Sequence, residues 1–337
     1  MGSPAAEAVP APDALAVDRV KAGLERVWPE GLGHAEARLG IAVSGGPDST
    51  ALLLLVAAAL PERVEAATVD HGLRTESAAE ASMVAALCGR IGVPHAVLPV
   101  VVAKGNVQAE ARGARYAALA GWVEERGLSA LATAHHADDK AETLLMRLNR
   151  ASGVAGLAGT RGRGVVPGTA IPLLRPALDW RRTELAAVVV AAGVACAADP
   201  SNQDDRFDRV RIRKALAGAD WLDVGAVARS AEHLADADFA LDWMAALEWR
   251  SCVRREPMGL RYRPQAPRAV VLRVIARCVA ELSGEEPRGS AVARLLEALQ
   301  EGRPSSLGEL VVRPNAGGWT FTKAPVRAAA RAPKRPT

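Results

Sequence analysis

Short apolar segments alternate with amphipathic stretches along the first half of the chain. Four segments have the length of buried strands. They cover 38–43, 64–69, 93–102 and 128–134. A helical pattern follows each of these segments. The first ends near residue 60, and the others cover 76–91, 107–126 and 140–150. Because parallel strands need helical crossovers, strands that alternate with helices predict an α/β fold with a doubly wound parallel sheet.

The spacing of apolar residues changes after about residue 217 and predicts a second, smaller α+β domain that is mainly helical. Its helices are expected at 223–254, 269–282 and 289–301, and a strand pair at 309–313 and 319–323. Residues 161–169 are glycine-rich and are expected to form an unstructured, mobile substrate loop. An opening helix is expected at 14–28. The predicted domains are a disordered leader at 1–13, a first domain at 14–216, a second at 217–324 and a basic disordered tail at 325–337.

Composition narrows the class of protein. The 337 residues are half apolar, enough for two buried cores. The longest apolar stretch, 185–198, has fourteen residues, fewer than the roughly 20 that span a bilayer, so we expect core packing and no membrane. No export signal opens the chain, which favours a cytoplasmic location. The cysteines are Cys88, Cys196, Cys252 and Cys278, too scattered for a zinc site or a disulfide scaffold.

A glycine loop follows the first strand and precedes a helix: Ser44-Gly45-Gly46-Pro47-Asp48-Ser49-Thr50. Glycines allow backbone amides to approach a ligand closely, and the start of a helix attracts anions. The loop lacks the lysine of a Walker motif and the three spaced glycines of a dinucleotide fingerprint. It therefore predicts a different kind of phosphate site, with an ordinary strand-to-helix turn capped by serines as the alternative.

A second polar cluster follows the fourth strand: His135-His136-Ala137-Asp138-Asp139-Lys140-Ala141-Glu142. Asp139 and Glu142 are three residues apart, hence on one helical face, where they could hold an ammonium group or magnesium. Adjacent histidines point apart, so at most one is expected at the reaction centre. The alternative is an acidic first turn that only complements a helix dipole.

Two further groups carry charge. Asp70-His71-Gly72-Leu73-Arg74 follows the second strand, either as part of a site or as a surface turn. Arg112 and Arg115 share a helix face and could contact phosphate, and Arg206, Arg209, Arg211, Arg213 and Lys214 put five cations in nine residues. With a net charge of +4 and a pI near 9.1, such clusters favour a polyanionic partner, although either could be a solvated face.

These motifs resemble a known family. Ser-Gly-Gly-Pro-Asp-Ser at 44–49 is similar to the loop of the PP-loop ATP pyrophosphatases. The segments 69–74, 111–116, 133–143, 199–202 and 209–213 resemble the tRNA(Ile)-lysidine synthase family within that group, so the resemblance covers about 38–216. Val210 replaces a usual asparagine, and Lys140 stands where glutamine is common.

The resemblance implies a Rossmann-like, adenine nucleotide α-hydrolase-like fold with strand order 3-2-1-4-5. That order makes the loops after the first and fourth strands neighbours across one crevice. It also implies an ATP- and magnesium-dependent ligase. ATP adenylates O2 of the wobble cytidine in an isoleucine tRNA with a CAU anticodon. The ε-amine of free lysine then displaces AMP, giving lysidine and changing codon reading from AUG to AUA.

Site residues are assigned from spacing and from family position together. The predicted ATP-binding residues are Ser44, Gly45, Gly46, Pro47, Asp48, Ser49, Asp70 and His71. The predicted catalytic residues are Asp48, His135, Asp138, Asp139 and Glu142, with Asp139 and Glu142 binding lysine and Asp48 and Asp138 binding magnesium. The predicted tRNA-binding residues are Arg112, Arg115, Arg209, Arg211 and Arg213.

Two other interpretations stay open. One is a different PP-loop enzyme, such as a tRNA thiolase or an amidotransferase-linked synthetase; the isolated Cys88 and Cys196 disfavour the thiolase. The other is a noncatalytic RNA-binding protein that keeps the loop as structure. The sequence leaves the oligomeric state open, with a homodimer among the options.

Overall fold

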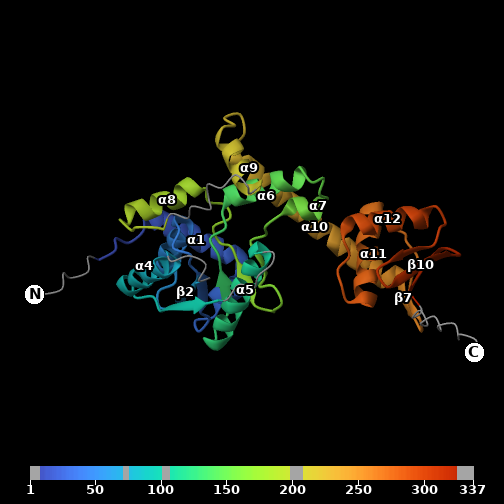
Figure 1. Cartoon of the computed structure of the whole chain (residues 1–337), viewed down its shortest axis with the longest axis horizontal. Helices are drawn as coiled ribbons and strands as arrows, with labels where there is room; N and C mark the ends of the chain where they lie inside the picture. The colour runs from blue at the N-terminus through green and yellow to red at the C-terminus, as the bar shows by residue number, and fades with distance from the viewer. Residues whose placement is uncertain (1–7, 71–75, 101–106, 198–207, 325–337) are drawn as a thin grey trace, which may run out of the picture. The chain divides into compact units, whose positions relative to one another are not determined.

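The computed structural model describes residues 8–70, 76–100, 107–197 and 208–324 (Figure 1). The chain divides into two compact units that part between Ala235 and Asp236. The boundary predicted at 216/217 falls at the end of α9 (Asp208–Ala217), and α10 (Val224–Cys252) runs across the division. The tail at 325–337, His71, residues 199–202 and part of the leader lie outside the described residues.

The first unit is built on a six-stranded sheet with the order β3-β2-β1-β4-β6-β5. All neighbours are parallel except β5, which pairs antiparallel with β6 at one edge. The predicted doubly wound sheet is confirmed, and β6 takes the fifth place in the predicted order. The strands are β1 (Leu39–Ala42), β2 (Val64–Asp70), β3 (His95–Pro99), β4 (Ala130–Ala132), β5 (Arg163–Val165) and β6 (Pro172–Leu174).

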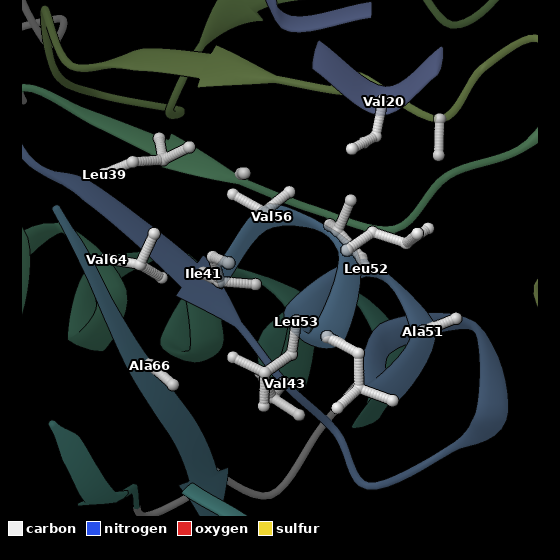
Figure 2. Packing of buried hydrophobic residues seen from close by; sticks show 14 of the residues in the cluster. Val20, Leu39, Ile41, Val43, Ala51, Leu52, Leu53, Val56, Val64 and Ala66 are labelled. Carbon is white, nitrogen blue, oxygen red and sulfur yellow. The ribbon is translucent and has the colours of Figure 1, made fainter. Parts of the chain in front are cut away.

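Helices cover both faces of this sheet because its central strands are apolar on both sides. Leu39, Ile41 and Val43 point from the first strand toward α3 (Figure 2). Ala42 points to the opposite face and packs in the cluster formed with α5. Helices α1, α3, α4 and α8 share the first face. The helices of this unit are α1 (Ala14–Val27), α2 (Pro29–Gly33), α3 (Pro47–Ala59), α4 (Glu76–Arg90), α5 (Val107–Glu125), α6 (Ala137–Leu148), α7 (Val154–Ala158) and α8 (Arg182–Ala191), followed by α9 and the start of α10.

Two local predictions were wrong. The glycine-rich segment 161–169 is not wholly unstructured, because it contains β5, which is held by ladder hydrogen bonds to β6. The three residues of β5 are exposed, so the strand has no apolar pattern that would have predicted it. Helix α6 begins at Ala137 instead of Lys140, which places Asp138 and Asp139 in its first turn. The carboxylates are therefore on a rigid helix end.

The second unit packs α11 (Arg268–Ser283) and α12 (Gly289–Gln300) on a five-stranded antiparallel sheet ordered β7-β8-β11-β10-β9. Its predicted helices and its last two strands are confirmed. The pairing of β7, β8 and β9 was not predicted, because these strands have only three or four residues each. The strands are β7 (Val253–Glu256), β8 (Gly259–Tyr262), β9 (Ser305–Leu307), β10 (Leu310–Asn315) and β11 (Gly318–Lys323). In the part of the chain described, no helix combines the length and apolarity needed to cross a bilayer.

Lys140 ties α6 to α10 within the first unit. Its side chain is only 4% exposed, and Nζ donates a hydrogen bond to Glu232 Oε1 at 2.5 Å. Glu232 itself is half exposed. The ammonium is therefore the buried member of the pair, and it depends on a carboxylate at the surface.

This asymmetry predicts unequal effects of two matched substitutions. Glu232→Gln leaves a buried ammonium without its carboxylate and should lower the free energy of unfolding by about 1–3 kcal/mol. Lys140→Gln returns Glu232 to water and should cost less than about 1 kcal/mol. Urea denaturation of both variants measures the difference. Equal losses would contradict the assignment of Lys140 as the dependent partner.

Candidate active site

The glycine loop between β1 and α3 is held in shape by its own serines. Ser49 Oγ donates to the Gly46 carbonyl at 3.1 Å and accepts from the Ser44 amide at 3.1 Å. The amide of Ala197 donates to the Gly45 carbonyl at 2.9 Å, which fixes the loop from the chain that follows α8. Pro47 occupies the first position of α3, where its missing amide hydrogen costs nothing. The loop is thus a preformed end of a thirteen-residue helix.

The two glycines of this loop differ in what requires them. Gly45 has φ +82°, a left-handed conformation in which a side chain is strained. Gly46 has φ −73°, and a Cβ there would meet nothing closer than Ser44 Oγ at 3.7 Å. The protein itself therefore demands glycine only at Gly45, while the cavity that Gly46 lines explains the second glycine.

This difference predicts a separation of stability from binding. Gly46→Ala should stay within about 1 kcal/mol of the wild-type free energy of unfolding yet weaken ATP binding at least about tenfold, because a methyl group would obstruct the close approach of phosphate. Gly45→Ala should lose about 1–2 kcal/mol of stability from its backbone conformation. Calorimetric titration with ATP and urea denaturation measure the two effects. Normal ATP affinity in Gly46→Ala would refute the placement of phosphate at this residue.

A cavity of about 560 Å³ opens over this loop. Its walls come from the ends of β1 and β2, from the loop and the first turn of α3, and from Ser77 and Glu80 of α4. Three arginines from three other elements also line it: Arg115 of α5, Arg182 of α8 and Arg213 of α9. A cavity with a helix start and three guanidinium groups suits a polyphosphate.

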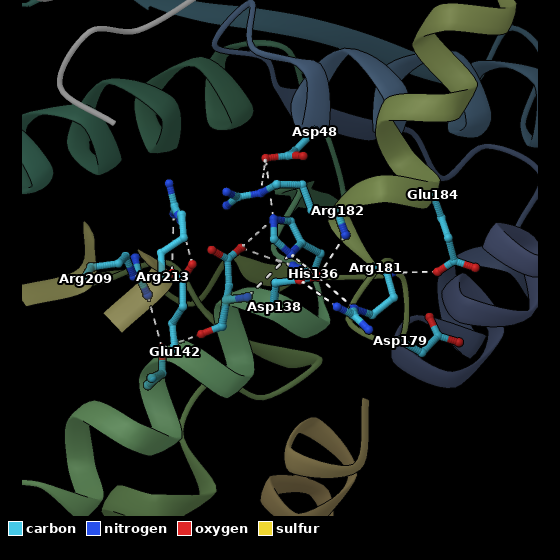
Figure 3. Close-up of polar contacts among 12 residues, drawn as sticks. Asp48, His136, Asp138, Glu142, Asp179, Arg181, Arg182, Glu184, Arg209 and Arg213 are labelled. Atoms are coloured by element: carbon cyan, nitrogen blue, oxygen red, sulfur yellow. Dashed lines mark hydrogen bonds and ion pairs between the residues drawn. The ribbon is translucent and has the colours of Figure 1, made fainter. Parts of the chain in front are cut away.

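The start of α6 meets this loop directly, as the predicted strand order requires. His136 is the N-cap of α6, 1% exposed, and its Nε2 lies 3.4 Å from Asp48 Oδ2 (Figure 3). Asp48 also lies 4.0 Å from Arg182 Nε. The loops after the first and fourth strands are therefore joined through a carboxylate and an imidazole.

His136 is surrounded by acidic groups. Burial alone lowers its pKa, but the carboxylates of Asp138, Asp48 and Asp139 outweigh burial and raise its pKa to about 9. The Asp139 amide approaches Nδ1 at a long 3.4 Å, and Asp138 Oδ2 lies 3.6 Å from the same nitrogen. His136 accordingly connects the acidic residues of two elements, and these carboxylates favour its protonated form.

His135 has the opposite electrostatic character. Burial lowers its pKa to about 4, with repulsion from the guanidinium groups of Arg175, Arg115 and Arg209 adding to the effect against Asp139. Its Nδ1 is hydrogen-bonded to Thr133 Oγ1 at 3.0 Å. In the tautomer whose Nδ1–H donates to Thr133, Nε2 is the acceptor nitrogen. The surroundings of these two adjacent histidines thus shift their pKa values in opposite directions.

Glu142 is the most deeply buried carboxylate of the cluster, at 1% exposure. Its oxygens lie 2.7 Å from Arg213 Nε and 3.2 Å from Arg209 Nε, and both arginines come from α9 (Figure 3). Arg209 also donates to Thr143 Oγ1 at 3.1 Å. Helix α9 is therefore fixed against α6, and Val210 of α9 is buried at 5% exposure.

Both carboxylate oxygens of Asp138 accept hydrogen bonds. Both of its oxygens accept from the guanidinium of Arg181 at 3.2 Å, and Oδ2 accepts from the Arg182 amide at 2.8 Å. Burial alone raises the pKa of Asp138, but the hydrogen bonds from His136, Arg181 and the Arg182 amide outweigh it and hold that pKa well below its usual range. The carboxylate fixes the start of α8 against α6.

The structure puts the predicted site residues in four places. Ser44, Gly46, Pro47, Asp48 and Ser49 line the cavity, and Arg115 and Arg213, predicted to bind tRNA, line it as well. His135, Asp138, Asp139 and Glu142 lie beside it at the start of α6. Asp70 stands apart from the cavity lining and accepts from Ser77 Oγ at 2.6 Å. Arg211 is exposed and pairs with Asp208.

Arg182 was missed by sequence reasoning, as was the connecting role of His136. Arg182 lies in an arginine pair at the start of a helix, a position that carries no motif of its own. Its link to Asp48 and Asp138 depends on α8 packing beside α3.

The acidic groups do not build a metal site by themselves. Among the residues that the structure describes, no group of three or more histidine, cysteine, aspartate or glutamate side chains is arranged to hold a metal ion. Asp48 Oδ1 is buried and has no hydrogen-bond partner in the protein. A magnesium ion that takes most of its ligands from phosphates and water needs only one or two carboxylates, so Asp48 fits such an ion.

Comparisons with known proteins agree with this geometry. A family model described as a PP-loop domain matches residues 18–219. A tRNA(Ile)-lysidine synthase from Novosphingobium aromaticivorans is 46% identical, with 94% of this chain and 97% of the relative aligned. A tRNA(Ile)-lysidine synthase from Zymomonas mobilis is 42% identical over 86% of this chain and 89% of the relative.

A solved structure shares the fold. The U34-tRNA thiolase NcsA from Methanococcus maripaludis superposes with a TM-score of 0.54 at 14% identity, over 65% of this chain and 80% of the thiolase. Similarity at that level of identity concerns the fold alone. The family model and the length and identity of the sequence matches show that the chain belongs to the PP-loop proteins and, among them, to the tRNA(Ile)-lysidine synthase family.

Proposed function

We propose that this protein ligates lysine to C2 of the wobble cytidine of an isoleucine tRNA with a CAU anticodon, using ATP and releasing AMP and pyrophosphate. The observation that carries the proposal is the 3.4 Å contact between Asp48 of the phosphate loop and His136 at the start of α6. It joins a site for a triphosphate to a cluster of carboxylates. Because the substrate is a tRNA, we place the reaction in the cytoplasm.

The triphosphate is assigned to the cavity above the glycine loop. The start of α3 lines this cavity and would attract an anion, and Arg115, Arg182 and Arg213 supply positive charge from three other elements. Fixed charges of this kind stabilise the charge that develops on phosphate during transfer. Magnesium, when bound, would neutralise phosphate oxygens, and we assign Asp48 as its protein ligand, since Asp138 is already engaged by Arg181.

The amine is assigned to the carboxylates of α6. Asp139 and Glu142 share a helical face and would bind the ammonium of free lysine. Glu142 already pairs with Arg209 and Arg213 of α9. The lysine ammonium would therefore share the Glu142 carboxylate with these two guanidinium groups. His135, neutral and next to this pair, is placed to accept a proton.

The chemistry proceeds in two displacements. First, O2 of the cytidine attacks the α-phosphorus of ATP, a new P–O bond forms, and the bond to pyrophosphate breaks. Then the lysine nitrogen attacks C2, a C–N bond forms, the C2–O2 bond breaks with AMP leaving, and the amine loses its protons. The ammonium gives up one proton before the attack and the nitrogen a second one after it, and we assign their acceptance to His135 Nε2 and to the carboxylate of Asp139.

The test is a reconstituted reaction with the full chain. Incubation with ATP, lysine and the isoleucine tRNA should release AMP only when both lysine and tRNA are present, and mass analysis should place one added lysine on the wobble nucleotide. A tRNA whose wobble cytidine is replaced by uridine is the control and should give no product. An unmodified wobble nucleotide with intact tRNA binding would refute the ligase and favour an RNA-binding role.

A further inference from the structure

Three arginines gather around one tyrosine beside the nucleotide cavity. The guanidinium of Arg112 lies over the ring of Tyr116, 5.1 Å from its centroid. Tyr116 also acts electrostatically on Arg175, whose Nη1 donates to the Arg161 carbonyl at 2.8 Å. Arg115, one turn from Arg112 on α5, interacts with both Tyr116 and Arg112. The three cations therefore share one neighbourhood, defined here as the Arg112–Arg115–Arg175 cluster.

This cluster has no compensating acid in the part of the chain described. None of the carboxylates there forms an ion pair with any of its three members, although most other arginines around the site have one. Burial lowers the pKa of Arg115 and of Arg175; Tyr116 opposes this shift, and the charge of Arg112 adds to it as a smaller effect. Like charges held together cost free energy, which a bound anion would recover.

The geometry also gives the cluster a direction. Arg175 follows β6, and His135 follows the neighbouring β4, so both lie at the same carboxyl edge of the sheet. The charge of Arg175 acts on His135, the predicted proton acceptor. Arg175 Nε is buried and has no hydrogen-bond partner in the protein. An anion bound here would thus lie next to the reacting groups.

Of the three, only Arg115 lines the nucleotide cavity; Arg112 and Arg175 stand outside its walls. Arg112 is exposed, as expected of a residue that meets a large partner. A polyanion whose reacting base enters the site from solvent brings a phosphate on either side of that base. This geometry suits a strand of RNA better than a second part of the bound nucleotide.

We propose that Arg112 and Arg175, with Arg115 between them and the cavity, form a subsite for a backbone phosphate that flanks the target base of the substrate RNA. The proposal rests on the proposed function for its substrate class. It adds Arg175 to the residues that contact RNA and gives Arg112 a specific place in that contact. The fork of each guanidinium matches a phosphate group.

The experiment measures tRNA binding by the full chain without lysine, at several salt concentrations, together with ATP affinity. Arg175→Gln and Arg112→Gln should each weaken tRNA binding about 5- to 10-fold and reduce the slope of log affinity against log salt by about 1. ATP affinity should stay within about twofold of wild type. Arg175→Lys, which keeps the charge but loses the fork, should retain the wild-type slope.

Arg38→Gln is the matched control. Arg38 precedes β1, at the amino ends of the strands, and pairs with Glu65. Because Glu65 keeps its second partner Arg126, the salt slope should not change in this variant. An unchanged slope in Arg175→Gln and Arg112→Gln, or a loss of ATP affinity with normal tRNA binding, would overturn the subsite. Because no turnover is measured, these results are independent of lysidine formation, whose absence would overturn the ligase and leave the subsite standing.

Discussion

Glu142→Gln is expected to reduce lysine ligation by at least about 100-fold while ATP-dependent activation of the tRNA stays within about twofold of the wild-type rate. Glu142 is buried and balances Arg209 and Arg213. Without its negative charge the two guanidinium groups repel the incoming ammonium. Release of pyrophosphate measures the first displacement, and lysine-dependent release of AMP measures the second, so the defect should appear in the second alone.

A loss of stability could imitate this result, and the chain offers a matched control. Glu65 is also a buried glutamate with two arginine partners, Arg38 and Arg126, at the other edge of the sheet. Glu65→Gln should destabilise the fold to a similar degree but should leave both displacements unchanged in the folded fraction. Ligation by Glu142→Gln at a third or more of the wild-type rate would exclude Glu142 from the amine site.

The sequence predicted where the site lies better than how its parts connect. Apolar strand patterns placed the clusters at 44–50 and 135–142 after two strands, and parallel strands deliver such clusters to one edge. Ala42 and Ala132 indeed end neighbouring strands, so the convergence followed from periodicity and strand order. This part required no knowledge of side-chain contacts.

The links between elements depended on contacts that no local pattern encodes. Asp138 appears in sequence as one of two adjacent acids, but its environment is set by Arg181, 43 residues later. His136 contacts Asp48 as the N-cap of α6, and this helix begins three residues earlier than its apolar spacing suggested. Short strands such as β5 carry too few residues to show alternation, and pairing alone creates them.

Asp48→Asn is expected to reduce both displacements by at least about 100-fold, in contrast to the selective defect of Glu142→Gln. Asp48 lies in the first turn of α3, 3.4 Å from His136 and 4.0 Å from Arg182, with one oxygen buried and unpaired. Asparagine keeps the shape but removes the charge that balances two cations. Release of pyrophosphate and of AMP, measured in parallel, should fall together.

Part of the loss of rate in Asp48→Asn should come from weaker magnesium binding, which a measurement of ATP affinity can detect. If Asp48 holds the ion, Asp48→Asn should weaken ATP binding in the presence of magnesium and change it little when magnesium is chelated. Asp13→Asn, a carboxylate-to-amide change at the start of α1, controls for the helix-end charge and should leave ATP binding unchanged. Equal loss of ATP affinity with and without magnesium would remove Asp48 as a metal ligand, and its role would then be to balance His136 and Arg182 alone.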